Sequence, residues 1–280
     1  MIYILVPTFA RLEDTKRFLN SIHKSIESPY KILLIDDHPD KITYKNVDED
    51  DEIEVITSNK ELWWVGSINL GIQNLFEKHN LKDDDFVIFA NNDVQIDKDS
   101  FNALHAELLK NNKQIVHPRT IDHNGFEVSS GAKIYSFFPY ITKHPKNFLN
   151  NKQTIDMGTA RFLMMSGYVL NEVGFINDDL VQYGGDNDFT LSARRYHSIY
   201  SYIIRDSICI LQDTHTGIKN HKLKNVSELY NSFFSIRSPN NIKYRYIFFK
   251  KFFGKIFAFF IVASLIFNTL FKYFFYIKRR

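Results

Sequence analysis

Cysteine is nearly absent from this chain, which has one, Cys209, among 280 residues. One thiol forms no internal disulfide, and the chain reaches an acidic pair at Glu13-Asp14 too early for a secretory signal with a basic first region. We therefore expect a reducing, cytoplasmic setting, with Cys209 buried as a small apolar residue. Eleven glycines and seven prolines are too few for a collagen-like or low-complexity chain, so the sequence is expected to fold.

Two phosphate-binding motifs are also missing. The sequence contains no GxxxxGK[ST] loop, and VPTFARLED stands after the first apolar run where a GxGxxG fingerprint would be. Both motifs use glycines to bring backbone N–H groups close to phosphates. Their absence argues against a P-loop nucleotide hydrolase and against a dinucleotide-binding dehydrogenase.

Acidic residues are absent from the C-terminal part of the chain. No Asp or Glu follows Glu228, whereas residues 229–280 hold ten Lys or Arg. Residues 1–228 keep 25 basic and 32 acidic side chains, a net charge of −7, although the whole chain carries +3. An acidic body with a basic tail predicts that the tail meets an anionic surface, either phospholipid or nucleic acid.

Apolar runs alternate with helical patterns along the first part of the chain. This order predicts an α/β fold with parallel strands and right-handed crossovers. The strands are expected at 1–8, 31–37, 53–57 and 85–90, and the helices at 12–26 and 66–79. The later pattern is mixed, and with no repeat or linker the halves should pack as one body. It predicts helices at 99–111 and 187–197, a hairpin turn at 122–125, and a strand with a short helix within 160–175.

The tail from residue 226 has a different composition. Eighteen Phe and Tyr residues follow residue 229, and the stretch 256–271 is uncharged, with Lys255 and Lys272 beside it. A spanning helix needs about 20 residues. Basic flanks and abundant aromatics favour a helix lying in the membrane interface over a short tilted span or a buried helix. We expect three parts, residues 1–97, 98–225 and 226–280, the last a membrane anchor.

Polar clusters follow two of the expected strands. Asp36-Asp37 ends the second strand, and Asn92-Asp93 follows the fourth. We expect these strands to be neighbours in one sheet, so that the clusters share the crevice at the carboxyl ends of the strands. A carboxylate there can hold Mg²⁺ or Mn²⁺ together with substrate phosphates.

Five short motifs stand in this order along the chain: Val6-Pro7-Thr8-Phe9 with Arg11; Ile35-Asp36-Asp37; Asn59 followed by Trp63-Trp64-Val65-Gly66 and Asn69-Leu70-Gly71; Asn91-Asn92-Asp93; and Tyr183-Gly184-Gly185-Asp186-Asn187-Asp188-Phe189 with Arg194. Together they resemble the family 2 glycosyltransferases, which are inverting nucleotide-sugar enzymes with a GT-A fold. The resemblance covers about residues 1–217. Its last motif and its tryptophan motif look most like bacterial enzymes of surface-polysaccharide assembly, including rhamnosyl and galactosyl transfer.

The resemblance implies roles for individual residues. Asp186 matches the general base, and Asp93 matches the residue that holds Mg²⁺ or Mn²⁺ on the donor diphosphate, with His215 as a further metal or phosphate ligand. Trp63, Trp64 and Asp188 would line the sugar or acceptor pocket; alternatively, the tryptophans belong to the core and Asp188 charges the first turn of a helix. The residues expected at the nucleotide are Thr8, Phe9, Arg11, Asn69, Asn92, and either Asp36 or Asp37 at the base.

The expected reaction follows from these roles. An acceptor hydroxyl, deprotonated by Asp186, attacks the anomeric carbon in one step, which inverts its configuration while the diphosphate leaves. The donor is a nucleotide-diphosphate sugar, and the expected acceptor is a lipid-linked oligosaccharide at the cytoplasmic face of a bacterial inner membrane. Two alternatives remain: a non-catalytic module tethered to membrane or nucleic acid, and a degenerate transferase, because Asn92 replaces an acid. Nucleic acid is disfavoured, since a solvated groove would not tolerate the aliphatic runs of the tail.

Overall fold

The fold is a mixed α/β structure around one large sheet. It is seen in a computed structural model that describes residues 1–137, 140–145, 148, 150–212, 223 and 225–277. The main sheet has the strand order β10-β13-β6-β12-β4-β1-β2-β3, with β5 paired to β13 and β7 to β6. Its strands are β1 (Ile2–Thr8), β2 (Tyr30–Asp36), β3 (Ile53–Thr57), β4 (Phe86–Ala90), β5 (Val94–Ile96), β6 (Gln114–Asp122), β7 (Glu127–Val128), β10 (Lys152–Ile155), β12 (Phe162–Ser166) and β13 (Tyr200–Leu211).

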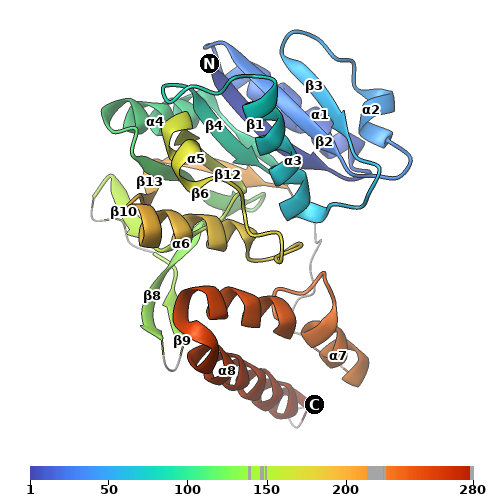
Figure 1. Ribbon diagram of the computed structural model, residues 1–280, viewed down its shortest axis with the longest axis vertical. Helices are drawn as coiled ribbons and strands as arrows, with labels where there is room; N and C mark the ends of the chain where they lie inside the picture. Colours follow the sequence, from blue (N-terminus) through green and yellow to red (C-terminus); the bar gives the residue numbers. More distant parts are fainter. Residues whose placement is uncertain (138–139, 146–147, 149, 213–222, 224, 278–280) are drawn as a thin grey trace.

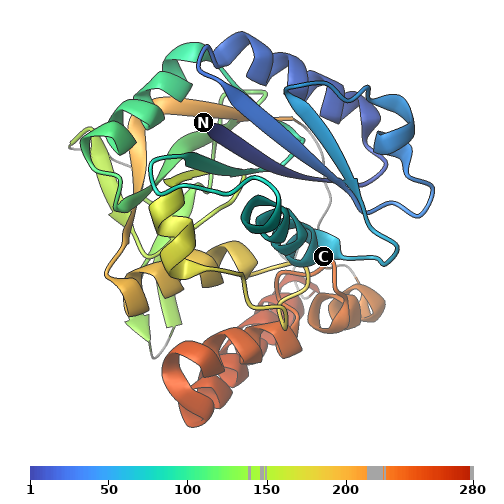
Figure 2. The ribbon, with the colours of Figure 1, turned by 45° about the horizontal axis from the view of Figure 1, so that its top comes forward.

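Helices cover both faces of this sheet (Figures 1 and 2). Neighbouring residues of a strand point to opposite faces, so in β1 Leu5 joins one buried cluster and Ile4 the other. Helices α1 (Leu12–Ser25) and α4 (Lys98–Lys110) pack on the Ile4 side, while α3 (Trp63–Glu77), α5 (Gly167–Val173) and α6 (Gly185–His197) pack on the Leu5 side. The short helix α2 (Ile42–Asn46) lies between β2 and β3 in the chain.

The sequence-based elements are largely confirmed, with one correction. The strands β1 to β4 pair in parallel wherever they are adjacent, and the turn at 122–125 joins β6 to the antiparallel strand β7. The strands that end at Asp36 and Ala90, however, are not neighbours, because β1 pairs with both and lies between them. Parallel strands still end at one edge, so the polar residues after β2 and β4 remain on the same side of the sheet.

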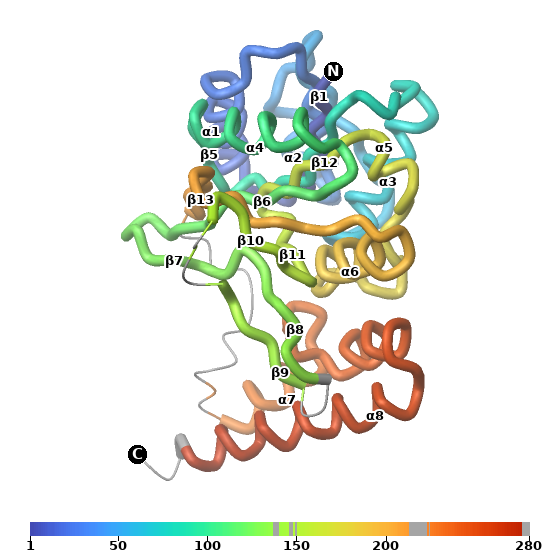
Figure 3. The backbone as a smooth tube through the Cα atoms, turned by 90° about the vertical axis from the view of Figure 1, so that its left-hand side faces the viewer, coloured from blue at the N-terminus to red at the C-terminus, as the bar shows by residue number. Residues whose placement is uncertain are grey.

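A smaller sheet extends from the body toward the C-terminal helices (Figure 3). It consists of β11 (Met157–Gly158), β8 (Gly131–Phe137) and β9 (Tyr140–Lys143), all antiparallel. The ring of Tyr140 lies against that of Phe249, with centroids 4.7 Å apart. The β8–β9 hairpin thus contacts the start of the C-terminal helix and helps fix its position.

The C-terminal region forms two helices, α7 (Val226–Phe234) and α8 (Ile242–Ile277). Helix α8 is broken at Gly254, whose φ of 78° and ψ of 166° are not helical. Before the break, Phe248, Phe249 and Phe252 are buried in the Leu5-side cluster. The first part of α8 is therefore packed into the folded body.

Beyond Gly254, helix α8 buries one face and exposes another. Ala258 and Ile261 are buried, whereas Ile256 and Phe267 are 73% and 72% exposed. Within the described residues, the stretch Ile242–Phe275 is the one helix long and apolar enough to cross a membrane by length and composition. The aromatic residues exposed after the break are Phe257, Phe259, Phe260, Phe267, Phe271, Phe274 and Phe275.

Candidate functional site

Two connected cavities lie at the carboxyl ends of the parallel strands. The first, which we call the strand-end cavity, has a volume of about 370 Å³ and borders β1, β2 and the start of α3. The second, the hairpin cavity, has about 560 Å³ and lies among β8, β9, the start of α6 and the start of α8. They are continuous, because both are lined by Trp64, Asn91, Asp93, Gln182 and Tyr183.

Asp36 and Asp37 take different positions although they are adjacent in the sequence. Asp36 is fully buried, and its carboxylate accepts hydrogen bonds from the backbone N–H groups of His38 and Tyr44. Asp37 lines the strand-end cavity, and its two oxygens accept from Leu62 N at 2.6 Å and Trp63 N at 2.7 Å. Of the two expected base contacts, only Asp37 reaches the cavity, and Asp36 instead fixes the chain that follows β2.

Thr8, Phe9 and Trp63 line the strand-end cavity. The hydroxyl of Thr8 donates to Ile35 O, while Phe9 is 42% exposed. Trp63 has a φ of 58°, a left-handed conformation that a bulky residue rarely adopts. The Asp37 carboxylate, by binding the N–H of Trp63, holds that residue at the cavity.

Asn92 and Asp93 also line the strand-end cavity, but their side chains have different partners. The Asn92 amide donates to Thr15 Oγ1 of α1 at 2.9 Å and is 7% exposed. The Asp93 carboxylate pairs with Arg11 at 3.3 Å. Asp93 therefore supplies the acidic side chain of this pair at the cavity, with Arg11 beside it.

A metal ion at Asp93 would need ligands besides this carboxylate. No cluster of three or more His, Cys, Asp or Glu side chains forms a metal site within the described residues. Mg²⁺ is commonly held by one or two carboxylates together with substrate phosphates and waters, a mode for which Asp93 supplies the carboxylate. His215, the other expected ligand, lies outside the described residues, as does Asp213.

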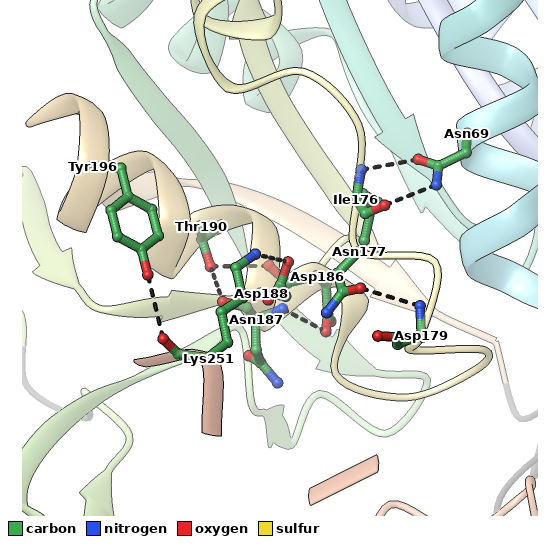
Figure 4. Close-up of polar contacts among 10 residues, drawn as sticks. All are labelled: Asn69, Ile176, Asn177, Asp179, Asp186, Asn187, Asp188, Thr190, Tyr196 and Lys251. Carbon is green, nitrogen blue, oxygen red and sulfur yellow. Dashed lines mark hydrogen bonds and ion pairs between the residues drawn. The ribbon is translucent and has the colours of Figure 1, made fainter. Parts of the chain in front are cut away.

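Asp186 lines the hairpin cavity at the first turn of α6 (Figure 4). Its Oδ1 accepts from the backbone N–H of Asn187 at 2.8 Å. Burial raises the pKa of this carboxyl above its ordinary value, and the nearby Arg161 guanidinium opposes that rise. A carboxylate with a raised pKa at a cavity wall is suited to accept a proton from a bound hydroxyl.

Asp188 and Asn69 lie outside both cavities, contrary to their expected contacts with acceptor and nucleotide. Asp188 is buried in the first turn of α6 and pairs with Lys251 of α8, so it has no free face toward an acceptor. The Asn69 amide bridges α3 to Ile176, accepting from its N–H and donating to its carbonyl, both at 2.9 Å (Figure 4). Its hydrogen bonds order the loop before α6 instead of binding a ligand.

Three arginines that sequence reasoning did not single out line the cavities. Arg161 and Arg245 face the hairpin cavity, and Arg237 faces the strand-end cavity with its guanidinium 5.9 Å from the Trp63 ring centre. Arg237 and Arg245 had been counted only as charges of the basic tail. Their position in the sequence, at the start of the tail and before the long apolar stretch, was the available signal.

The sheet order, the strand-end cavity and the acidic residue that opens α6 together define a nucleotide-sugar transferase fold of the GT-A type. Residues 3–174 match the family described as glycosyl transferase family 2. The match covers more than half of the chain, and the protein belongs to this family.

One curated relative is the low-salt glycan biosynthesis hexosyltransferase Agl10 of Haloferax volcanii. It is 21% identical over 196 residues, which make up 69% of this chain and 61% of the relative. The chain thus spans less than two thirds of that protein's length.

Two solved structures share the fold. GalNAc-T7, crystallised with UDP, GalNAc and Mn²⁺, has a TM-score of 0.57 at 12% identity, covering 88% of this chain and 50% of its own. TarS 1-349 of S. aureus has a TM-score of 0.51 at 14% identity, covering 97% and 72%. At these identities the likeness establishes the GT-A fold, and the family match establishes the family.

Proposed function

We propose that this protein is an inverting glycosyltransferase that moves a hexosyl group from a nucleotide-diphosphate sugar to a hydroxyl of a lipid-linked oligosaccharide. The main support is the continuity of the two cavities, since Asp93 borders both and Asp186 borders the second. A donor in the strand-end cavity would present its anomeric carbon toward the hairpin cavity. An acceptor there would lie between the donor and Asp186.

The residues of the strand-end cavity would bind the donor. Asp37, Phe9 and Thr8 border the nucleotide in this proposal, while Arg11 neutralises part of the diphosphate charge. Asp93 would hold Mg²⁺ or Mn²⁺, and His215 is proposed as a second ligand; the cation would stabilise the negative charge of the leaving diphosphate. GalNAc-T7, the structural neighbour crystallised with UDP and Mn²⁺, supports this choice of cation.

Asp186 would act as the general base. Burial raises the pKa of this carboxyl, which makes the carboxylate a stronger proton acceptor, while the Arg161 guanidinium opposes the rise. The deprotonated acceptor oxygen attacks, the bond between the anomeric carbon and the diphosphate oxygen breaks, and the configuration inverts. Such general-base catalysis typically contributes a factor of about 10² to 10⁴ in rate.

We further propose that the second part of α8 lies in the membrane interface, on the cytoplasmic side of a bacterial inner membrane. The support is the exposed apolar face between Lys255 and Lys272, with the ten basic and no acidic residues after Glu228. In this arrangement residues 226–280 form the anchor, residues 1–97 the donor half and residues 98–225 the acceptor half. An anchored enzyme meets a lipid-linked acceptor at high effective concentration.

A donor-binding screen tests the proposed function. Thermal unfolding is measured with a panel of nucleoside diphosphates and their sugars, with and without Mn²⁺, because a ligand that binds only the native state raises its stability. We expect stabilisation by one nucleotide class, enhanced by Mn²⁺, and slow hydrolysis of the matching donor sugar. A folded protein that none of these ligands stabilises would contradict the proposal.

The role of Asp186 is tested by Asp186→Asn, with Asp179→Asn as the matched control at an exposed position of the preceding loop. We expect Asp186→Asn to lose about 10²- to 10⁴-fold in transfer rate while the donor still raises the melting temperature. Asp179→Asn should behave as the natural sequence. Unchanged transfer in Asp186→Asn would remove it from the mechanism, and donor binding without transfer in the natural sequence would indicate a degenerate transferase.

A further inference from the structure

We propose that Arg245 binds a phosphate of an isoprenoid-diphosphate-linked acceptor at the wall of the hairpin cavity formed by α8. The proposal rests on the proposed function, because it takes the hairpin cavity as the acceptor site. It assigns the tail a second task besides anchoring, namely to recognise the charged part of the substrate.

The position of Arg245 is the first observation. It lies in the first turn of α8 and lines the hairpin cavity together with Tyr244 and Phe248 of the same helix. Its Nε donates to Pro239 O at 2.8 Å, which fixes the plane of the guanidinium. Among the described residues no carboxylate forms an ion pair with Arg245.

The charge of the cavity is the second observation. Arg161, which donates to Ser129 O, also lines the hairpin cavity and has no ion pair with an acid among the described residues. Two guanidinium groups thus border a cavity whose carboxylates, Asp93 and Asp186, are already assigned to cation and proton chemistry. Guanidinium groups bind phosphate oxygens through paired, charge-assisted hydrogen bonds, which suits an anionic acceptor.

The path of α8 indicates which anion this is. Helix α8 runs from Arg245 to the break at Gly254, and the exposed apolar face of its second part begins at Ile256. From Arg245 to the break at Gly254 the helix rises over nine residues, roughly 14 Å, so a phosphate at Arg245 lies within reach of a hydrocarbon chain on the apolar face that begins just past the break. A ligand with a sugar, a diphosphate and an isoprenoid tail matches this order: its sugar hydroxyl would lie near Asp186, its diphosphate at Arg245 and its tail on the apolar face.

The donor diphosphate is a less suitable ligand for Arg245. The strand-end cavity holds Arg11 and Arg237, and Arg245 is not among its lining residues. The two cavities therefore have separate cationic groups, one set for each phosphate-bearing substrate.

Calorimetric titration of the full chain in a non-ionic detergent tests the proposal. The probes are farnesyl diphosphate, farnesol, inorganic pyrophosphate and a short-chain phosphatidylglycerol. We expect farnesyl diphosphate to bind more tightly than farnesol or pyrophosphate, and Arg245→Gln to weaken it about 10- to 100-fold, as expected for lost hydrogen bonds to a charged group. Lys243→Gln, an exposed neighbour outside the cavity, should bind as the natural sequence does.

A second variant keeps the test decisive if Arg245→Gln folds poorly. Arg245→Lys keeps the charge but loses the paired donors, and it should give an intermediate affinity with an unchanged melting temperature. The proposal is overturned if farnesyl diphosphate binds both Arg245 variants as tightly as it binds the natural sequence. It is also overturned if farnesol binds as tightly as farnesyl diphosphate, or if phosphatidylglycerol binding depends on Arg245 to the same degree. Donor binding and hydrolysis, measured in parallel, report on the proposed function separately, because Arg245 lies outside the strand-end cavity.

Discussion

The Nζ atom of Lys251 lies 2.7 Å from Oδ2 of Asp188, so a cation of the C-terminal helix neutralises a buried carboxylate two residues from Asp186. Burial raises the pKa of Asp188, and Lys251 opposes that rise. The first turn of α6 is therefore held in place by the tail (Figure 4). This contact links the element that carries the candidate base to the element that carries the exposed apolar face.

Removing either partner of this pair should destabilise the protein. Because Lys251 is 31% exposed, we discount the cost of a fully buried pair and expect Lys251→Met to lower the free energy of unfolding by about 1–3 kcal/mol. Asp188→Asn should have a similar cost, and the double variant should cost clearly less than the sum. Urea unfolding measures all three, with Lys250→Met as the exposed control; strictly additive losses would mean that the two side chains do not interact.

Asp37 is predicted to act on the donor through the backbone of α3. In Asp37→Ala the N–H groups of Leu62 and Trp63 lose their acceptors, and the unfolding free energy should fall by about 2–4 kcal/mol. Donor affinity should fall as well, because the left-handed Trp63 loses its anchor. Asp40→Ala, an exposed change three residues away, is the control. Weaker donor binding at full stability would instead indicate direct contact with the base.

The acid limb of the activity profile should depend on Arg161. Transfer falls at low pH as Asp186 becomes protonated, with a midpoint above the ordinary carboxyl value because burial raises its pKa. The Arg161 cation lowers this pKa, so Arg161→Gln should move the midpoint to higher pH. Measured kcat/KM against pH gives the midpoint for the natural sequence, Arg161→Gln and the exposed α6 control Arg195→Gln. A midpoint that stays in place or falls would contradict the assignment of Asp186.

The exposed apolar face of α8 should bind anionic vesicles. Phe267→Ser removes an aromatic ring that is 72% exposed on this face and should weaken co-sedimentation with phosphatidylglycerol vesicles about tenfold. Phe126→Ser, whose ring is also 72% exposed but sits on the β6–β7 turn, should change nothing. Binding should weaken with added salt, because the basic residues contribute through screened charge. Equal binding by both variants would show that this face does not meet the vesicle.

The sequence was sufficient for the elements and for the edge where polar residues gather. Strand β3 was predicted at its observed bounds, and the residues after β2 and β4 reach the same cavity system. Local apolar periodicity determines these features. The insertion of β1 between β2 and β4 depends on which strand edges pair across the chain, and no local pattern encodes that.

Side-chain partners were harder to predict than positions. Asp36 and Asp37 are chemically identical, yet one is buried beneath the chain after β2 and the other faces the cavity, a difference set by the alternation of the strand. The sequence left Asp188 open to an acceptor contact, but in the structure its carboxylate pairs with Lys251, 63 residues later in the chain. Composition described the tail correctly as basic and aromatic, but it carried no information on how Arg237 and Arg245 come to line the two cavities.

Helix α8 bends sharply at Gly254, in a backbone conformation that favours glycine. Its φ of 78° with ψ of 166° falls in a region that side-chain-bearing residues almost never occupy. Any other residue there would favour a straight helix, which would move the part of α8 beyond the break away from α7 and change its angle to the two cavities. Gly254 thus sets the direction of the second part of α8 relative to the rest of the protein, because it has a hydrogen atom where other residues have a Cβ.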